Sequence, residues 1–425
     1  MIAKWHWLLL GLLRKLWLRA ASFALLGVAT ALLSIAAEWI IPWDLPAKIG
    51  ADAVDQILNI LASSMLAVTT FSLTVMMVAY SAATENVTPR ATQILRQDPT
   101  TQNVLATFLG SFLYSLVGII ALNTDLYGER GRAMLFLVTL GVILIIVVTL
   151  LRWIEHLASL GRVDETSRRI EAAAQAAIVT RAKDPCMGGR PLPDGGHAIP
   201  VSAVPFCSAT IGYVQHVDMQ MLSRLADEEK ADIYLDGLPG LLVHPSRPLV
   251  WIDVGDVGGE KAEKIAASVC AAFTVGDQRT FDEDPRFGLV VLTEIASRAL
   301  SPGINDPGTA IDIIGRLLRL LMTWKSEQAE EAADPHWPRI WVPPLRLKDM
   351  FDDAFMPIAR DGAPMVEVEL RLLKSLLALS RLGDDYAASA VRLARVALLH
   401  AESKLVLEQE KSRLRDVIAE IEASA

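Results

Sequence analysis

Cysteine and histidine are scarce in this sequence of 425 residues, which holds three cysteines and seven histidines. Cys186, Cys207 and Cys270 are odd in number and form no Cys-x-x-Cys pair. This pattern excludes a disulfide framework and suits free thiols in a reducing compartment. His197 lies between two of the cysteines, but one histidine and two distant cysteines do not make a zinc pattern. We therefore predict no metal site and no cofactor.

Positive charge is also in short supply, because 40 Lys and Arg stand against 49 Asp and Glu, for a net charge of −9. Residues 1–155 hold 10 basic and 9 acidic residues, so the acidic excess belongs to residues 156–425. Surfaces that bind nucleic acid are basic because they neutralise phosphates. We therefore expect no nucleic-acid partner.

Charge is absent altogether from four long stretches, which are residues 20–37, 56–84, 99–124 and 133–151. A helix needs about 20 apolar residues to cross the hydrocarbon core of a bilayer. The stretches therefore predict four transmembrane helices in a lipid bilayer. The first stretch is longer than the apolar part of a signal peptide, and another follows it, so an uncleaved anchor is expected.

Loop charges predict the orientation of these helices. Basic residues gather before the first stretch, after the second and after the fourth, whereas the first loop carries Asp44, Asp52 and Asp55 against Lys48. Short cytoplasmic loops are enriched in Lys and Arg. We therefore expect a multi-pass protein of the bacterial inner membrane with both termini in the cytoplasm.

The second stretch is rich in hydroxyl side chains, among them Ser63, Thr70 and Thr74. Two interpretations stay open. Small hydroxylated residues allow helices to pack closely, or they line a hydrated path in a homo-oligomer. No charged residue or histidine occupies the middle of any stretch, which argues against a proton-coupled pump.

Changes of hydrophobic period beyond residue 155 predict the domain organisation. We expect four regions: a transmembrane domain at 1–155, a juxtamembrane helix with a Pro/Gly linker at 156–205, a cytoplasmic α+β domain at 206–325 and a C-terminal helical region at 326–425. The predicted fold class is an all-α four-helix membrane domain plus an α+β cytoplasmic domain with a small β-module and a C-terminal helical bundle.

Several elements of the last two regions can be named. Four β-like runs and one helix, "DMQMLSRLADEEK", lie between residues 206 and 254. After residue 324 a polar, proline-containing excursion precedes two helices, near 364–381 and 385–422, which are expected to pack as a bundle or to self-associate.

The least ordinary segment is "RALSPGINDPGTA", residues 298–310. Asp-Pro pairs stand at 284–285 and at 306–307. Asp is a good N-cap and Pro is favoured at the first helical position, so helices are expected near 285–300 and 307–324. Thr309 then lies three residues after Asp306, in the capping position. On this reading the segment is a capped corner between two helices.

Two further interpretations of the segment stay open. The start of the second helix offers free N–H groups, so a small anionic ligand could bind there with help from Arg279, Thr280, Arg298, Ser301, Asn305, Asp306 and Thr309. A hydrolytic site at Ser301 lacks a nearby histidine in the sequence, and no catalytic residue is assigned. Arg298 also follows Glu294 by four residues, which suits a helix ion pair.

Four apolar stretches followed by a domain with "GDQRTFDEDPRFG" and "RALSPGINDPGTA" resemble the bacterial family of predicted membrane proteins called domain of unknown function 2254. The resemblance covers nearly the whole chain. It implies a membrane topology and brings no established activity.

These observations favour a homo-oligomeric inner-membrane protein in which a cytoplasmic domain senses a ligand and regulates a channel- or transport-like membrane part. A membrane-anchored enzyme that uses the Arg279–Asn305 region is the first alternative, and a structural scaffold is the second. The sequence shows no convincing catalytic constellation, which weighs against the enzyme.

Overall fold

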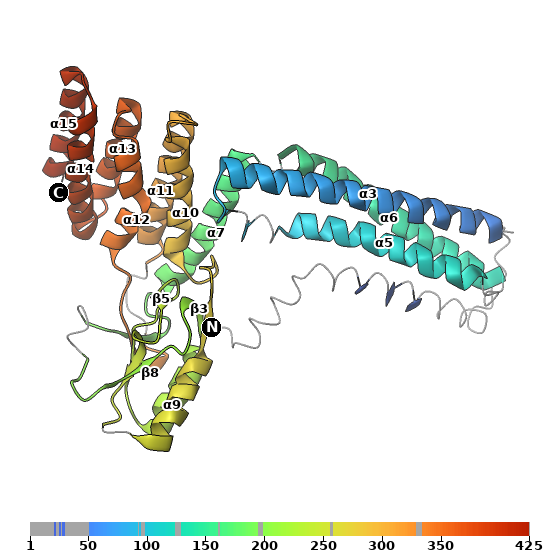
Figure 1. The fold of residues 1–425 in the computed structure, drawn as a ribbon, viewed down its shortest axis with the longest axis horizontal. Helices are drawn as coiled ribbons and strands as arrows, with labels where there is room; N and C mark the ends of the chain where they lie inside the picture. The colour runs from blue at the N-terminus through green and yellow to red at the C-terminus, as the bar shows by residue number, and fades with distance from the viewer. Residues whose placement is uncertain are drawn as a thin grey trace. The chain divides into compact units, whose positions relative to one another are not determined.

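The chain forms two compact units in a computed structural model (Figure 1). We call residues 4–166 the N-terminal unit and residues 167–425 the C-terminal unit, with which residues 1–3 are grouped. The structure describes residues 21–22, 25–26, 28–29, 51–91, 93–94, 98–123, 129–159, 162–193, 199–255, 258–328 and 334–424.

Three long helices make up most of the described N-terminal unit: α3 (Ala51–Asn86), α5 (Pro99–Asn123) and α6 (Glu129–Ser159). Within the described residues, these three are long and apolar enough to cross a membrane. About two thirds of the stretch expected at 20–37 lies outside the described residues. A four-helix membrane domain is therefore not confirmed.

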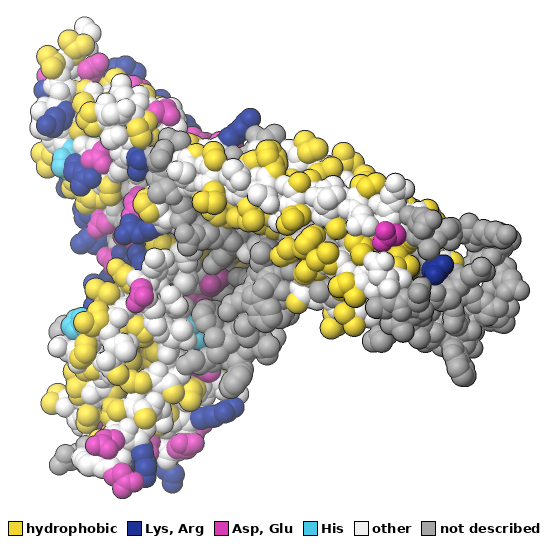
Figure 2. Space-filling model, turned by 45° about the vertical axis from the view of Figure 1, so that its right-hand side comes forward, with side chains coloured by type: hydrophobic (Ala, Val, Ile, Leu, Met, Phe, Trp, Pro, Cys, Tyr) yellow, Lys and Arg dark blue, Asp and Glu magenta, His cyan; other side chains and the backbone are white. Residues whose placement is uncertain are grey.

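Apolar side chains of this unit face inward and outward alike. Leu58, Phe108 and Leu135 are buried between the helices. Phe71 and Leu144 are more than half exposed, and hydrophobic side chains cover much of the visible surface of these helices in Figure 2. Helices that are apolar on every side suit an apolar solvent.

Two small sheets form one end of the C-terminal unit. The five-stranded sheet has the order β1-β8-β4-β6-β2, and the three-stranded sheet has the order β5-β3-β7. The strand bounds are β1 (Gly189–Pro191), β2 (Val204–Cys207), β3 (Gly212–Val217), β4 (Ile233–Leu235), β5 (Leu242–Val243), β6 (Pro248–Ile252), β7 (Phe273–Gly276) and β8 (Trp337–Val342).

Two helices, α8 (Met219–Glu229) and α9 (Gly259–Ala272), complete this module. Leu222 of α8 and Val269 of α9 share its hydrophobic core with Val250 of the five-stranded sheet and Val214 of the three-stranded sheet. The four β-like runs and the helix between them are confirmed as β3, β4, β5, β6 and α8.

The remaining helices form a bundle with α7 (Val163–Lys183). They are α10 (Pro285–Ala299), α11 (Pro307–Ser326), α12 (Leu347–Asp361), α13 (Val366–Ser380), α14 (Asp384–Lys404) and α15 (Glu408–Ala423). The helices expected near 285–300 and 307–324 are confirmed as α10 and α11.

Two expectations for the C-terminal region are corrected. The polar excursion contains β8, which pairs in parallel with β1 and β4. The single helix expected at 385–422 is two helices, broken at residues 405–407. Because α15 folds back, Leu414, Ile418 and Ile421 become buried. Burial of these side chains favours the break, although no Gly or Pro marks it in the sequence.

Candidate functional site

The corner between α10 and α11 is closed by hydrogen bonds within its own residues. The Ser301 hydroxyl donates to the carbonyl oxygen of Arg298 over 2.6 Å. The backbone N–H of Asp306 donates to the carbonyl oxygen of Ala299 over 2.8 Å. Asn305 has φ 51°, in the left-handed region that Asn tolerates better than most residues. The hydroxyl of Ser301 is thus engaged locally.

Asp306 occupies the N-terminal end of α11. Its carboxylate accepts from the backbone N–H of Thr309 over 3.1 Å and from the Thr309 hydroxyl over 2.6 Å. These hydrogen bonds lower the pKa of Asp306 below its ordinary value. A ligand anion at this helix end would therefore meet a fixed carboxylate. The Nε of Arg298, in the last turn of α10, is buried without a hydrogen-bond partner.

Arg279 lies at the opposite end of α10. Its guanidinium binds the Asp284 carboxylate through two bonds, of 2.6 and 3.0 Å, and covers the Phe287 ring at 5.1 Å from the ring centroid. Asp284 is the N-cap of α10, whereas Arg298 is in its last turn. A helix of 15 residues is about 22 Å long. The structure therefore groups Arg298, Ser301, Asn305, Asp306 and Thr309, and places Arg279 and Thr280 elsewhere.

Arg279 belongs instead to a buried charge cluster, defined here as Arg181, His216, Arg279, Glu283 and Asp284. Arg181 of α7 is 5% exposed, and burial lowers its pKa while the carboxylate of Glu283 opposes that shift. His216 of β3 lies 2.6 Å from Glu283, measured from Nδ1 to Oε1. The cluster therefore ties α7, the β-module and the start of α10 together.

Sequence reasoning singled out Arg279, and Asp284 as a helix cap, but missed Arg181, His216 and Glu283. Arg181 and His216 lie far from the "TFDEDPRFG" run along the chain, so no local spacing connects them to it. Arginine is seldom fully buried unless it is paired. Only folding shows that Arg181 is buried.

Helix α7 has a second anchor on α11. The Glu171 carboxylate accepts from Arg316 Nη1 over 2.8 Å and from Arg319 Nε over 2.7 Å. Arg316 is 7% exposed at its side chain, and its Nε also binds Asp312 over 2.6 Å. Buried ion pairs that lose one partner leave an uncompensated charge. Glu171 therefore holds α7 in one position against α11.

The hydroxyl stripe of α3 lies on an exposed face of that helix. Ser63 donates to the carbonyl oxygen of Asn59 over 2.9 Å, Thr70 to that of Leu66 over 3.0 Å, and Thr74 to that of Thr70 over 3.0 Å. All three residues are exposed in the chain by itself. Their donors are thus satisfied within α3, and the stripe does not pack between the described helices of the unit.

A buried polar pair joins the ends of two other helices in the N-terminal unit. His156 Nε2 of α6 lies 2.9 Å from Asp98 Oδ2, just before α5. The same carboxylate accepts from the backbone N–H of Thr101 over 3.0 Å and caps α5. The pair fixes the start of α5 against the end of α6.

A row of ring side chains crosses the five-stranded sheet. Cross-strand neighbours in register are Arg190 and Trp341, Trp341 and Tyr234, Tyr234 and Trp251, and Trp251 and Pro205. The Tyr234 and Trp341 rings stack with centroids 6.1 Å apart, and Arg190 covers Trp341 at 5.4 Å. Pairs of this kind stabilise a sheet.

A groove of about 490 Å³ lies between α10 and α12, with Glu294, Asp352 and Asp353 among its walls. Asp353 accepts from Arg286 over 2.6 Å, and Asp352 accepts from Arg392. Arginine therefore neutralises two of the three carboxylates. Among the described residues, no group of three or more His, Cys, Asp or Glu side chains could hold a metal ion.

Within the described residues, the N-terminal unit holds three helices long and apolar enough to cross a membrane, which is the composition of a membrane protein. Residues 14–378 match the family described as predicted membrane protein (DUF2254), and the chain belongs to this family.

Proteins similar to this chain are found in mycobacteria. Uncharacterised proteins of Mycobacterium bovis and Mycobacterium tuberculosis are each 27% identical to it over 252 residues, which is 58% of this chain and 47% of theirs. The chain thus matches about half the length of these curated relatives. No solved structure matches the chain.

Proposed function

We propose that this chain is a homo-oligomeric, multi-pass protein of the bacterial inner membrane, with both termini in the cytoplasm. Its C-terminal unit senses a ligand and regulates a channel- or transport-like N-terminal unit. One observation carries the regulatory part: α7 follows the last apolar helix directly and is anchored in the C-terminal unit at both Glu171 and Arg181.

The short connection between α6 and α7 supports transmission of movement. Helix α6 ends at Ser159 and α7 begins at Val163. Three intervening residues span at most about 10 Å when fully extended. A ligand that binds more tightly when α7 is in one of two positions shifts α7 toward that position, and the end of α6 moves with it. The size of the shift is set by the difference in ligand affinity between the two positions.

The proposed conducting path uses the exposed stripe of Ser63, Thr70 and Thr74. Hydroxyls that bond to their own helix keep a free lone pair for water or an ion. In an oligomer, several copies of such a stripe can surround one hydrated path.

The proposed ligand is a small anion held by Arg298 and Asn305. Arg298 offers a buried Nε without a hydrogen-bond partner, and Asn305 is exposed on the adjoining turn. Inorganic phosphate should raise the melting temperature of the full chain. That rise should disappear in Arg298→Ala and in Asn305→Ala. If phosphate and other small anions leave the melting temperature unchanged, the ligand site is wrong.

Flux through reconstituted protein tests the conducting path. Salt-loaded vesicles with the full chain should release ions faster than empty vesicles, and Thr70→Leu should change the rate. Val78→Leu is the matched control, since Val78 is an exposed apolar residue of the same helix. Equal flux with and without protein, over several ions and voltages, would refute the path and leave a scaffold.

A flexible insertion tests regulation. Four glycine or serine residues placed between Ser159 and Val163 should abolish the effect of phosphate on flux and leave basal flux intact. Phosphate regulation that survives the insertion would exclude α7 as the route.

A further inference from the structure

Arg181 is a buried arginine without the direct partner that such residues usually have. Its side chain is 5% exposed, and its Nη1 atom has no hydrogen-bond partner. Arginine is seldom fully buried unless it is paired, and an unsatisfied buried group calls for a physical explanation. Arg181 lies in the last turn of α7. Whatever satisfies its guanidinium therefore fixes the end of that helix.

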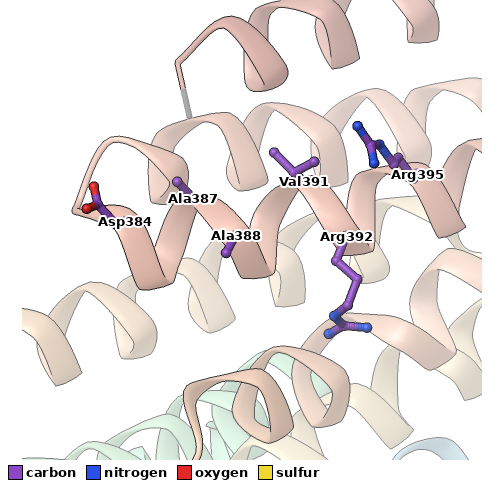
Figure 3. A pocket seen from close by; sticks show the side chains of 6 residues that line it. All are labelled: Asp384, Ala387, Ala388, Val391, Arg392 and Arg395. Atoms are coloured by element: carbon purple, nitrogen blue, oxygen red, sulfur yellow. The ribbon is translucent and has the colours of Figure 1, made fainter.

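Two arginines of α14 show the usual arrangement. Arg392 binds Asp352 of α12, and Arg395 binds Glu422 of α15. Figure 3 shows these two guanidinium groups at a hollow on α14, where they reach to opposite sides of the helix. Each of them thus finds a carboxylate on a neighbouring helix. Arg181, in contrast, lies near a carboxylate that another residue already holds.

That carboxylate belongs to Glu283, just before α10. Its Oε1 lies 2.6 Å from Nδ1 of His216, and its charge is also the one that acts most strongly on Arg181. His216 is 2% exposed, so both potential partners are held in the interior. The Glu283 side chain is 32% exposed and has room to turn. One carboxylate therefore lies between two buried donors.

Neighbouring carboxylates are engaged in other bonds. Asp284 binds Arg279 and caps α10, and Asp184 accepts from the backbone N–H of Gly188 over 2.6 Å. Glu283 is therefore the carboxylate on which a change in the charge of the imidazole acts first. The groups around Glu283 and His216 are Arg181, Asp184 and Cys186 from α7 and the turn after it, Arg279 and Asp284 from the segment before α10, Asp218 just after β3, where it caps α8, and the uncharged Thr274 from β7.

We infer that His216 and Arg181 compete for the Glu283 carboxylate, and that the proton on His216 decides between them. A protonated imidazole holds Glu283 through a charge-assisted hydrogen bond, which is the arrangement seen in the structure. A neutral imidazole can still donate from Nδ1 but carries no charge, so the guanidinium then binds the carboxylate. Histidine changes its charge between about pH 5 and pH 8. The end of α7 is therefore tied to the segment before α10 at the upper end of this range and released at the lower end.

This switch deepens the regulatory part of the proposed function. It rests on that proposal only for the effect on the membrane part, because α7 follows α6 directly. Release of the end of α7 in acid would weaken the coupling between the two units. The test below measures α7 by itself, without phosphate and without flux. It can therefore fail while those experiments succeed, and the reverse.

Hydrogen exchange of the full chain in lipid nanodiscs, followed by mass spectrometry, tests the switch at the backbone amides of residues 178–186. Each rate is divided by the intrinsic exchange rate at the same pH. In the parent chain, protection of this segment should rise about tenfold from about pH 5.5 to about pH 8, because a hydrogen bond between charged groups changes an equilibrium by roughly that factor. His216→Gln keeps a neutral donor at every pH, so its protection should stay at the higher level throughout.

His244→Gln is the matched control, because His244 is an exposed histidine of the same β-module, and it should show the same rise as the parent. Arg181→Gln removes the competing guanidinium and should abolish the rise. Flat protection in the parent, or a rise that persists in His216→Gln or in Arg181→Gln, would overturn the switch. Thermal unfolding shows whether each variant is folded. If Arg181→Gln is not, the contrast between the two histidine variants decides alone.

Discussion

Gly288 of α10 lies directly against Ala174 of α7. A Cβ added at Gly288 would be 2.2 Å from the Cβ of Ala174, far inside any real contact. Ala174 is itself 1% exposed. Helix α7 therefore approaches α10 to a distance that only a glycine permits, and this contact adds to the anchors at Glu171 and Arg181.

Gly288→Ala should destabilise the chain although alanine favours helices. Helix propensity alone would add about 1 kcal/mol, whereas overpacking of a close helix contact costs about 1–3 kcal/mol. Gly315→Ala is the control, since its new Cβ would meet only the ends of the flexible Arg371 and Arg319 side chains, at 3.4 and 3.9 Å. Thermal unfolding in detergent should show a lower midpoint for the first variant and an equal or higher one for the second. Equal midpoints would refute the close contact.

Asp306→Ala should cost roughly 0.5–2 kcal/mol, because it removes the cap of α11. Asp306→Asn should cost much less, since Asn caps nearly as well. The folded-state pKa of Asp306 is depressed. Its stabilisation is therefore present above the ordinary pKa and is lost as pH falls through the folded value. Unfolding of the parent chain, Asp306→Ala and Asp306→Asn as a function of pH measures both the loss of stability and its pH dependence. If Asp306→Ala is as stable as the parent, the cap does not stabilise α11.

Glu369 should make the chain less stable as pH rises. The residue is fully buried in α13, neither carboxylate oxygen has a hydrogen-bond partner, and burial raises its pKa to about 9. Its folded pKa is thus above the unfolded value of 4.5. Stability is full below that unfolded value and falls by about 1.4 kcal/mol per pH unit until pH passes the folded pKa.

Replacement of Glu369 tests this dependence. Glu369→Met should be more stable than the parent near pH 8 and should lose much of the pH dependence above about pH 5. Glu367→Met changes an exposed carboxylate of the same helix. It should change neither the stability near pH 8 nor its dependence on pH. A parent whose stability is flat over this range would show that a hydrogen-bond donor, a cation or water stabilises the Glu369 carboxylate in the folded chain.

Loop orientation is testable with thiol reagents in intact cells. A cysteine at Asp52 should react with a membrane-impermeant reagent, because the first loop is acidic and is expected outside. A cysteine at Arg96 should react only after the membrane is permeabilised. The native cysteines, all in the C-terminal unit, should be protected in the same way. The opposite pattern would reverse the topology and place the C-terminal unit outside the cytoplasm.

Tertiary structure decided most of the candidate site. Arg279 and Arg298 were grouped from the sequence because both are arginines near the same motif, yet α10 separates them and Asp284 engages the first. Arg181 and His216 had no local signal and still form the buried charge cluster with Glu283. Contacts of this kind join residues far apart in the chain, which periodicity and spacing do not report.

Features that depend only on neighbouring residues, by contrast, could be predicted from the sequence. Apolar length alone predicts α3, α5 and α6, because a bilayer requires about 20 residues without charge. Asp-Pro pairs predict the starts of α10 and α11, since caps depend on the backbone of one turn. The sequence did not predict β8 or the break between α14 and α15, because both depend on contacts with distant segments. A short strand is stabilised by partners from distant segments, and α15 turns back because burial of Leu414 and Ile418 against the bundle outweighs the continuation of one long helix.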